Sequence, residues 1–253
     1  MTAENRSFFI RSWPVLFADN HLLALYKPAG LLIQGDRTGD MTLIDLARQW
    51  VKVEYRKPGR VYLGMVHRID RPAAGVVLFC RTSKAAGRIS QQIRAGQTQK
   101  RYLVIVEGKL RPSSGRLVNY IERQGASGRI VDRGGGKSSQ ASLCFRVLET
   151  RAHASLVEVD LETGRHHQIR LQFSHLGHPV LGDLRYGASG PLAARQIALF
   201  AAGLTVIHPT QGQPLTFSAP LPRGWPWPEI DDTADAPPWN WSEMEEQVRQ
   251  FMP

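Results

Sequence analysis

GMVHRIDRPAAGVVLFCRTSKAAGR, residues 64–88, is the stretch that decides how the chain is organised. Its apolar run 75–80 predicts a buried strand, and the residues after it predict a helix that is capped by Ser83 and carries apolar residues at helical spacing. A strand that passes directly into a helix indicates a mixed fold. Asp70 is the single acid of the stretch, and it stands among the bases Arg68, Arg71, Arg81, Lys84 and Arg88.

Strand patterns outnumber helical patterns in the rest of the chain. Residues 15–33 read as an apolar strand closed by a Lys-Pro-Ala-Gly turn, and further strands are expected at 100–108, 155–164, 197–207 and 214–220. The glycine-rich, basic residues 127–141 predict a loop or hairpin, and residues 165–177 have a helical pattern. The interleaved order predicts an α+β fold with a mixed, mostly antiparallel central sheet flanked by helices and loops.

The charge of the chain is strongly basic and unevenly distributed. The 253 residues carry a net charge of +10, with a pI near 10.1. Seven of the 22 acids but only one of the 32 bases lie in residues 226–253, so residues 1–225 carry a net charge of +16. We therefore predict an N-terminal extension (1–14), a basic main domain (15–225) and an acidic C-terminal tail rich in Trp and Pro (226–253). A basic domain of this kind favours a polyanionic partner, nucleic acid first.

The basic residues are concentrated after Asp70. No acid occurs between Asp70 and Glu107, although seven bases do. Solvated surfaces normally mix both signs, so this run favours a surface that faces phosphates. A carboxylate among arginines remains ionised and acts as an anion. From chemistry alone, Asp70 could also cap a turn or pair with Arg68 or Arg71.

Several other classes of protein lack their required spacing. The segment 67–70 lacks the adjacent Arg-Asp pair of a kinase loop, and Val131 stands where a phosphate-binding loop before Gly136 and Lys137 needs glycine. The histidines form no His-Glu-x-x-His motif, and the adjacent His166 and His167 should diverge on a helix, so we expect no metal. Two cysteines and the absence of a long apolar run predict a cytoplasmic protein without a membrane span.

Three motifs in this order resemble the RluA-like family of RNA pseudouridine synthases: VHRIDRPAAGVVLFCRTSKAA, KRYLVIVEG and LETGRHHQIRLQFSHLGHPVLGDLRYG. The resemblance implies the pseudouridine synthase fold with a catalytic cleft, and an isomerase that converts uridine in ribosomal or transfer RNA to pseudouridine. It implies RNA as partner, no cofactor and a monomer. No S4 domain is expected, because only about 14 residues precede the first family-like segment.

The resemblance also assigns roles residue by residue. Asp70 corresponds to the essential aspartate, Tyr102 to the tyrosine that stacks on the flipped base, and Arg170 to the basic residue that pairs with the catalytic carboxylate. Arg68 corresponds to the residue that enters the helix stack where the uridine leaves it, and Leu171 would pack below the ring. The remaining matches are expected to shape the cleft: His67, Lys27, Arg165 and Gln168.

One carboxylate can suffice for such a reaction, because uracil can depart as a hydrogen-bonded anion and no leaving group needs a separate acid. Two routes remain open for Asp70: a covalent bond to the sugar, or assistance in deprotonation. The sequence departs from the family pattern at Ala73 and Ala74, where relatives commonly carry a hydroxyl. The alternative function is a catalytically inactive RNA-binding protein on the same fold.

Overall fold

The computed structural model describes residues 15–36, 38–132, 136–227 and 236–249. The expected N-terminal extension 1–14 lies outside them. The chain divides into two compact units: unit 1 contains residues 1–98 and 205–253, and unit 2 contains residues 99–204. The limits expected from the sequence, 15–225 and 226–253, stay a prediction.

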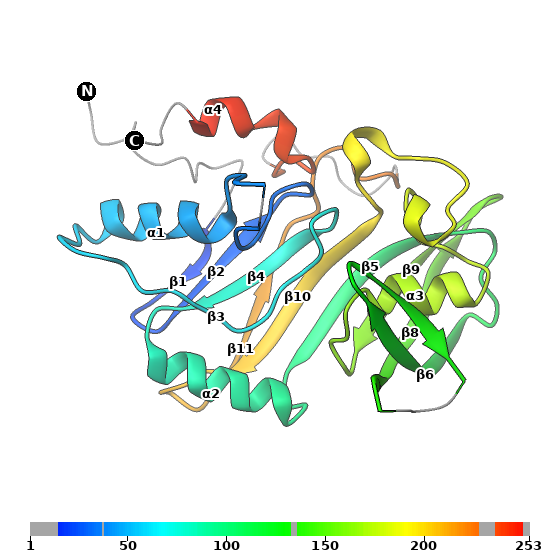
Figure 1. The fold of residues 1–253 in the computed structure, drawn as a ribbon, viewed down its shortest axis with the longest axis horizontal. Helices are drawn as coiled ribbons and strands as arrows, with labels where there is room; N and C mark the ends of the chain where they lie inside the picture. Colours follow the sequence, from blue (N-terminus) through cyan, green and yellow to red (C-terminus); the bar gives the residue numbers. More distant parts are fainter. Residues whose placement is uncertain (1–14, 37, 133–135, 228–235, 250–253) are drawn as a thin grey trace. The chain divides into compact units, whose positions relative to one another are not determined.

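Unit 1 is built on strands β2 and β4, in which every residue is buried. The two strands are antiparallel, from Leu22 opposite Cys80 to Lys27 opposite Gly75, and β1 and β3 pair with them in the same sense. Figure 1 shows α1 and α2 on different sides of these strands. The elements of unit 1 are β1 (Val15–Ala18), β2 (Leu22–Lys27), α1 (Leu43–Glu54), β3 (Gly64–Met65), β4 (Ala74–Cys80), α2 (Ser83–Arg94), β11 (Pro214–Ser218), the 3-10 turn η4 (Trp241–Glu243) and α4 (Glu245–Arg249).

Unit 2 is an antiparallel sheet with one helix packed on it. The strands lie in the order β10, β5, β9, β8, β6, β7, and α3 packs against β6 and β7 (Figure 1). The elements of unit 2 are β5 (Gln99–Glu107), β6 (Ser114–Gln124), β7 (Ser127–Val131), β8 (Ser138–Thr150), β9 (Ala154–Leu161), α3 (Gln168–His175), the 3-10 turns η2 (Leu184–Tyr186) and η3 (Ala193–Arg195), and β10 (Leu199–Ile207), whose last three residues belong to unit 1.

The structure confirms the α+β class and the strands expected at 75–80, 100–108, 155–164, 197–207 and 214–220, within a few residues. The single strand expected before the Lys-Pro-Ala-Gly turn was wrong, because β1 and β2 form a hairpin. Asp19 stabilises the turn between β1 and β2: its Oδ1 accepts the N–H groups of His21 and Leu22 at 2.7 and 2.6 Å. Short polar side chains favour such turns by bonding to the backbone two or three residues on.

The helix expected after β4 is confirmed, but its cap lies one residue earlier than predicted. Thr82 is extended, and its Oγ1 accepts the N–H of Ala85 at 3.1 Å, while Ser83 is the first helical residue. Residues 127–141, expected to be a loop or hairpin, contain β7 and the start of β8, and residues 133–135 lie outside the described part. Strands β7 and β8 do not pair with each other as a hairpin would: both pair with β6 and lie on opposite sides of it.

Candidate active site

Lys27 is the last residue of β2 and is fully buried. Its Nζ donates to the carbonyl oxygens of Pro28, Leu31 and Arg71 at 2.8, 2.9 and 3.1 Å. Burial lowers the pKa of Lys27 to about 7, the negative charge of Asp70 opposes this shift, and the positive charge of Arg71 adds to it. Lys27 therefore ties the Lys-Pro-Ala-Gly loop to the turn that carries Asp70.

Asp70 is half-buried on a turn that leads into β4, and its carbonyl accepts the N–H of Ala73 at 3.1 Å. The next residue, Arg71, is bound to Gly30 twice: its carbonyl accepts the Gly30 N–H at 2.7 Å, and its Nε donates to the Gly30 carbonyl at 2.9 Å. Gly30 has a φ of +95°, which favours glycine. The Nη2 of Arg71 also pairs with Asp40 at 2.7 Å. The backbone that carries Asp70 is thus held by the Lys-Pro-Ala-Gly loop.

His67 and Arg68, just before Asp70, differ in their surroundings. The Nε2 of His67 accepts the backbone N–H of Leu78 at 2.8 Å, so the imidazole fastens this segment to β4. Arg68 is exposed. His67 therefore holds the segment before Asp70 against β4. Arg68 has the solvent access that a contact with RNA requires.

Arg170 lies on α3 in unit 2, and its guanidinium is held by Asp183. Nε and Nη2 donate to the two carboxylate oxygens of Asp183 at 2.6 and 2.8 Å, and the two side chains are only 5% and 2% exposed. The guanidinium carbon also lies 4.9 Å from the centre of the Tyr186 ring. A guanidinium has five N–H donors, so one bidentate carboxylate does not exhaust it. The predicted pairing of Arg170 with the catalytic carboxylate stays a prediction.

Tyr102 and Leu171 are both buried in unit 2, at 8% and 6% exposure. Tyr102 lies on β5 opposite Val159 of β9. Leu171 packs with Ile121 and Ala141 in a hydrophobic cluster that Ile130 and Tyr186 extend. Leu171 therefore has a packing role in the core, and its expected place below the uracil ring stays a prediction.

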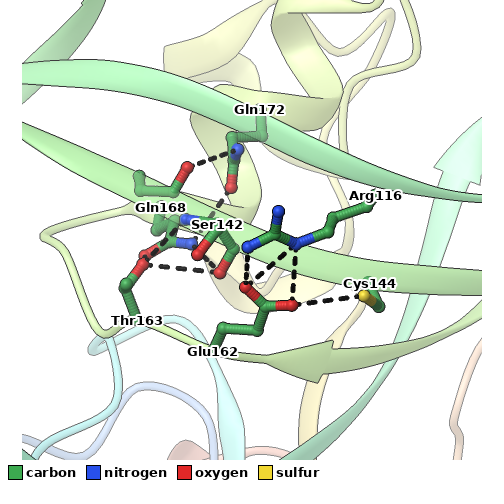
Figure 2. A network of polar contacts seen from close by, with 8 residues as sticks. Arg116, Ser142, Cys144, Glu162, Thr163, Gln168 and Gln172 are labelled. Atoms are coloured by element: carbon green, nitrogen blue, oxygen red, sulfur yellow. Dashed lines mark hydrogen bonds and ion pairs between the residues drawn. The ribbon is translucent and has the colours of Figure 1, made fainter. Parts of the chain in front are cut away.

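Gln168, at the start of α3, links the helix to the sheet (Figure 2). Its Oε1 accepts from the Thr163 hydroxyl and the Arg165 N–H at 2.7 and 3.0 Å, and its Nε2 donates to the Ser142 carbonyl and to Gln172 Oε1 at 3.0 and 3.1 Å. The exposed Arg165 donates from Nε to the Gln140 carbonyl at 2.9 Å. Gln168 and Arg165 therefore fix the segment that leads into α3.

Figure 2 also shows an ion pair beside this network. Arg116 binds Glu162 through Nε and Nη2, with the shortest contact at 2.7 Å, and Cys144 Sγ donates to Glu162 at 3.4 Å. The hydrogen bond from Arg116 is the main cause that lowers the pKa of Glu162 to about 2. The pair joins β6 to the end of β9 and keeps Glu162 anionic.

The expectation that His166 and His167 diverge on a helix was wrong. Their rings stack with centroids 3.7 Å apart, because His167 has a φ of 54° and precedes the helix instead of lying within it. His167 Nδ1 is 2.7 Å from the Tyr186 hydroxyl, which also accepts the Gly128 N–H at 3.2 Å. Among the described residues, no group of three or more His, Cys, Asp or Glu side chains could hold a metal ion.

The basic run after Asp70 serves more than one purpose. The guanidinium of Arg81 lies 3.8 Å from the centre of the Tyr55 ring and donates to the Asp19 carbonyl, and Arg88 donates to the Pro209 carbonyl. Other bases are exposed, namely Lys84, Arg94 and Arg101. Part of the run is therefore structural, and part is available to phosphates.

Sequence reasoning missed Asp183 and Tyr186. Both lie within the third family-like motif, but no periodicity or spacing connects them with Arg170, and only the fold brings the three side chains together. No described helix is long and apolar enough to cross a membrane.

Comparison with known proteins agrees with this arrangement. The family model for RNA pseudouridylate synthase matches residues 21–175. An uncharacterised RNA pseudouridine synthase, YhcT of Bacillus subtilis, is 35% identical over 214 residues, which cover 82% of this chain and 68% of that protein. The ribosomal large subunit pseudouridine synthase D of Zymomonas mobilis is 34% identical over 223 residues, covering 83% and 69%. The human RNA pseudouridylate synthase domain containing 4 has a similar fold, with a TM-score of 0.70 at 24% identity, covering 83% of this chain and 89% of that one.

The structure thus combines a mostly antiparallel α+β scaffold with an aspartate on a turn that backbone and side-chain hydrogen bonds of Arg71 hold in place. The chain belongs to the RNA pseudouridine synthases, isomerases that convert uridine in RNA to pseudouridine, and specifically to their RluA-like group.

Proposed function

We propose that the protein isomerises uridines in ribosomal RNA, with Asp70 as the catalytic residue. The relative from Zymomonas mobilis is named as a ribosomal large subunit synthase, which favours ribosomal RNA over the transfer RNA that the sequence left open. The proposal includes action as a monomer, without a cofactor, in the cytoplasm.

One observation carries the proposal: the turn of Asp70 is fastened to the loop of the buried Lys27 through Arg71, which bonds to both Lys27 and Gly30. A catalytic group must be held within a fraction of an ångström of its working position, and a second layer of hydrogen bonds does this. The turn of Asp70 has such a layer, while the Asp70 side chain keeps partial access to solvent.

The proposed reaction conserves all atoms. The bond between N1 and C1′ of uridine breaks, the uracil turns, and a bond forms between C5 and C1′. C5 then loses its proton, and N1, which carried none in uridine, gains one. Asp70 either bonds to C1′ while the uracil turns or assists in deprotonation, and in both routes the carboxylate must be ionised at the start.

The other residues have supporting roles in the proposal. The uridine must leave its stack, at a cost of a few kcal/mol. Arg68 would offset part of this cost by occupying the vacated position, and Tyr102 would stack on the uracil. Arg170 would keep Asp70 anionic through the N–H donors that its pair with Asp183 leaves available. Leu171 would limit the access of water to the reacting sugar.

The direct test measures tritium release from RNA labelled at C5 of uridine. Asp70→Asn keeps the size of the side chain but removes the anion, so release should fall below detection while RNA affinity stays within about twofold. Asp36→Asn is the matched control, because Asp36 is an exposed carboxylate of the same unit that bonds to Thr38. Substantial release by Asp70→Asn would refute the assignment, and loss of RNA binding by a folded Asp70→Asn would indicate a structural role.

A further inference from the structure

The C-terminal segment, residues 236–249, packs its apolar side chains into unit 1 although its composition predicts an acidic tail. Trp239, Trp241 and Met244 are each 6% exposed, and Val248 is 2% exposed. The segment lies beyond residues 21–175, which the family model matches. Its role therefore needs an explanation from its own contacts.

The segment binds the Lys-Pro-Ala-Gly loop through the backbone. The Ala29 N–H donates to the Trp239 carbonyl at 2.7 Å, and the Trp241 N–H donates to the Ala29 carbonyl at 2.8 Å. Asn240 lies between these two bonds, opposite Ala29 in a parallel bridge. Both the backbone N–H and the backbone carbonyl of Ala29 are thus hydrogen-bonded to the C-terminal segment.

A second contact anchors the same segment beside Lys27. Tyr26, the residue before Lys27, is fully buried, and its hydroxyl donates to the Pro238 carbonyl at 2.8 Å. The Trp225 and Trp239 rings pack edge to face with centroids 5.4 Å apart. Aromatic burial therefore holds the segment against the end of β2, where the loop begins.

The Lys-Pro-Ala-Gly loop, which the C-terminal segment holds, is in turn hydrogen-bonded to the turn of Asp70. The residue after Ala29 is Gly30, which is bound twice to Arg71. The connection from Trp241 to the neighbour of Asp70 thus runs through only two adjacent loop residues. All these contacts lie within unit 1.

We infer that the C-terminal segment is a positioning element of the active site: its backbone bonds to Ala29 fix the Lys-Pro-Ala-Gly loop, and the loop fixes the turn of Asp70. This inference rests on the proposed function for its effect on turnover. Whether the hydrogen bonds of the segment fix the loop can be tested even if the proposed function is wrong.

The test compares Trp241→Pro with Trp241→Ala in the full-length protein. Both variants lose the indole ring, but only proline also loses the N–H that donates to Ala29. Position 241 accepts proline, because it is the first residue of η4 and Asn240 before it has the extended conformation that proline requires, with φ −110° and ψ 130°. The difference between the two variants therefore isolates one hydrogen bond.

Two readouts separate positioning from stability. Amide hydrogen exchange of Gly30 should be about 3- to 10-fold faster in Trp241→Pro than in Trp241→Ala, the range expected for one net hydrogen bond. The kcat per folded enzyme should fall by a similar factor, with KM within about twofold. Phe217→Ala is the stability control: Phe217 is buried in β11 and packs on Phe17 with ring centroids 5.4 Å apart, so its loss should lower the Tm but leave kcat unchanged.

Equal Gly30 exchange and equal kcat in the two Trp241 variants would overturn the inference, as would a fall of kcat in Phe217→Ala as large as that in Trp241→Pro. Absence of turnover by the wild-type protein would overturn the proposed function instead. The Gly30 exchange rates would still decide whether the segment fixes the loop.

Discussion

Removing the charge of Asp183 should destabilise unit 2 strongly. Asp183→Asn leaves the guanidinium of Arg170 buried with an amide in place of its bidentate carboxylate. The matched control is Glu158→Gln. Glu158 also pairs with an arginine Nη2 at 2.8 Å, that of Arg146, but these two side chains are 22% and 65% exposed.

The burial of the two pairs sets the expected magnitudes. Breaking a buried pair by neutralising one partner costs about 3–5 kcal/mol, because the remaining charge is left uncompensated. An exposed pair contributes only about 0–1 kcal/mol, because water and salt screen it. For a chain of this size, about 1 kcal/mol changes the Tm by roughly 2–4 °C, so a loss of about 3–5 kcal/mol in Asp183→Asn should lower the Tm by roughly 6–20 °C.

Urea and thermal unfolding followed by circular dichroism measure both variants under identical conditions. We expect Glu158→Gln to unfold within a few degrees of the wild-type protein and Asp183→Asn to unfold far earlier. Equal shifts for the two variants, or a stabilised Asp183→Asn, would show that the buried pair does not hold α3 in place.

Three further predictions concern packing, titration and RNA binding. Gly128→Ala should lower the unfolding free energy by about 1–3 kcal/mol in urea titrations, because the new Cβ would lie 3.0 Å from Leu171 Cδ1 and 3.3 Å from the Glu122 carbonyl; an unchanged value would contradict this. Lys27, whose pKa burial lowers to about 7, should give a ¹³Cε titration near that pH that Lys27→Met abolishes. As the pH rises, the folded protein loses this proton near pH 7, whereas the unfolded chain keeps it until about pH 10. The unfolding free energy of the wild-type protein should therefore increase with pH between these two values, relative to that of Lys27→Met. RNA affinity should fall steeply between about 50 and 200 mM salt, because residues 1–225 carry a net charge of +16; a flat response in filter binding would exclude a phosphate-facing surface.

Local patterns predicted the apolar strands β4, β5, β9, β10 and β11, because their burial is visible in the sequence, but they did not predict β3, β6 or most of β8. β4 reads as a continuous apolar run, and all its residues are buried. Helix α1 was missed, although Thr42 caps it through Asp45 and apolar residues line its inner face. The pairing of β7 and β8 with β6 depends on long-range register, which no local pattern contains.

The candidate site was predictable only in part, for similar reasons. The resemblance singled out Asp70 and Arg170, but the carboxylate that holds Arg170 is 13 residues away, without a periodic signal. The composition of the C-terminal segment predicted an acidic tail, and it did not predict that Trp239 and Trp241 are buried. The backbone hydrogen bonds of Ala29 could not be predicted, because they do not depend on which side chains the bonded residues carry.

The central claim is that Asp70 of this chain makes pseudouridine in ribosomal RNA. Quantitative pseudouridine mapping of ribosomal and transfer RNA tests it most directly, in cells whose only copy of the gene encodes Asp70→Asn and in cells with the unaltered gene, at matched protein levels. We predict that one or more ribosomal positions remain uridine in the Asp70→Asn cells. Full modification at every ribosomal position in those cells would contradict it.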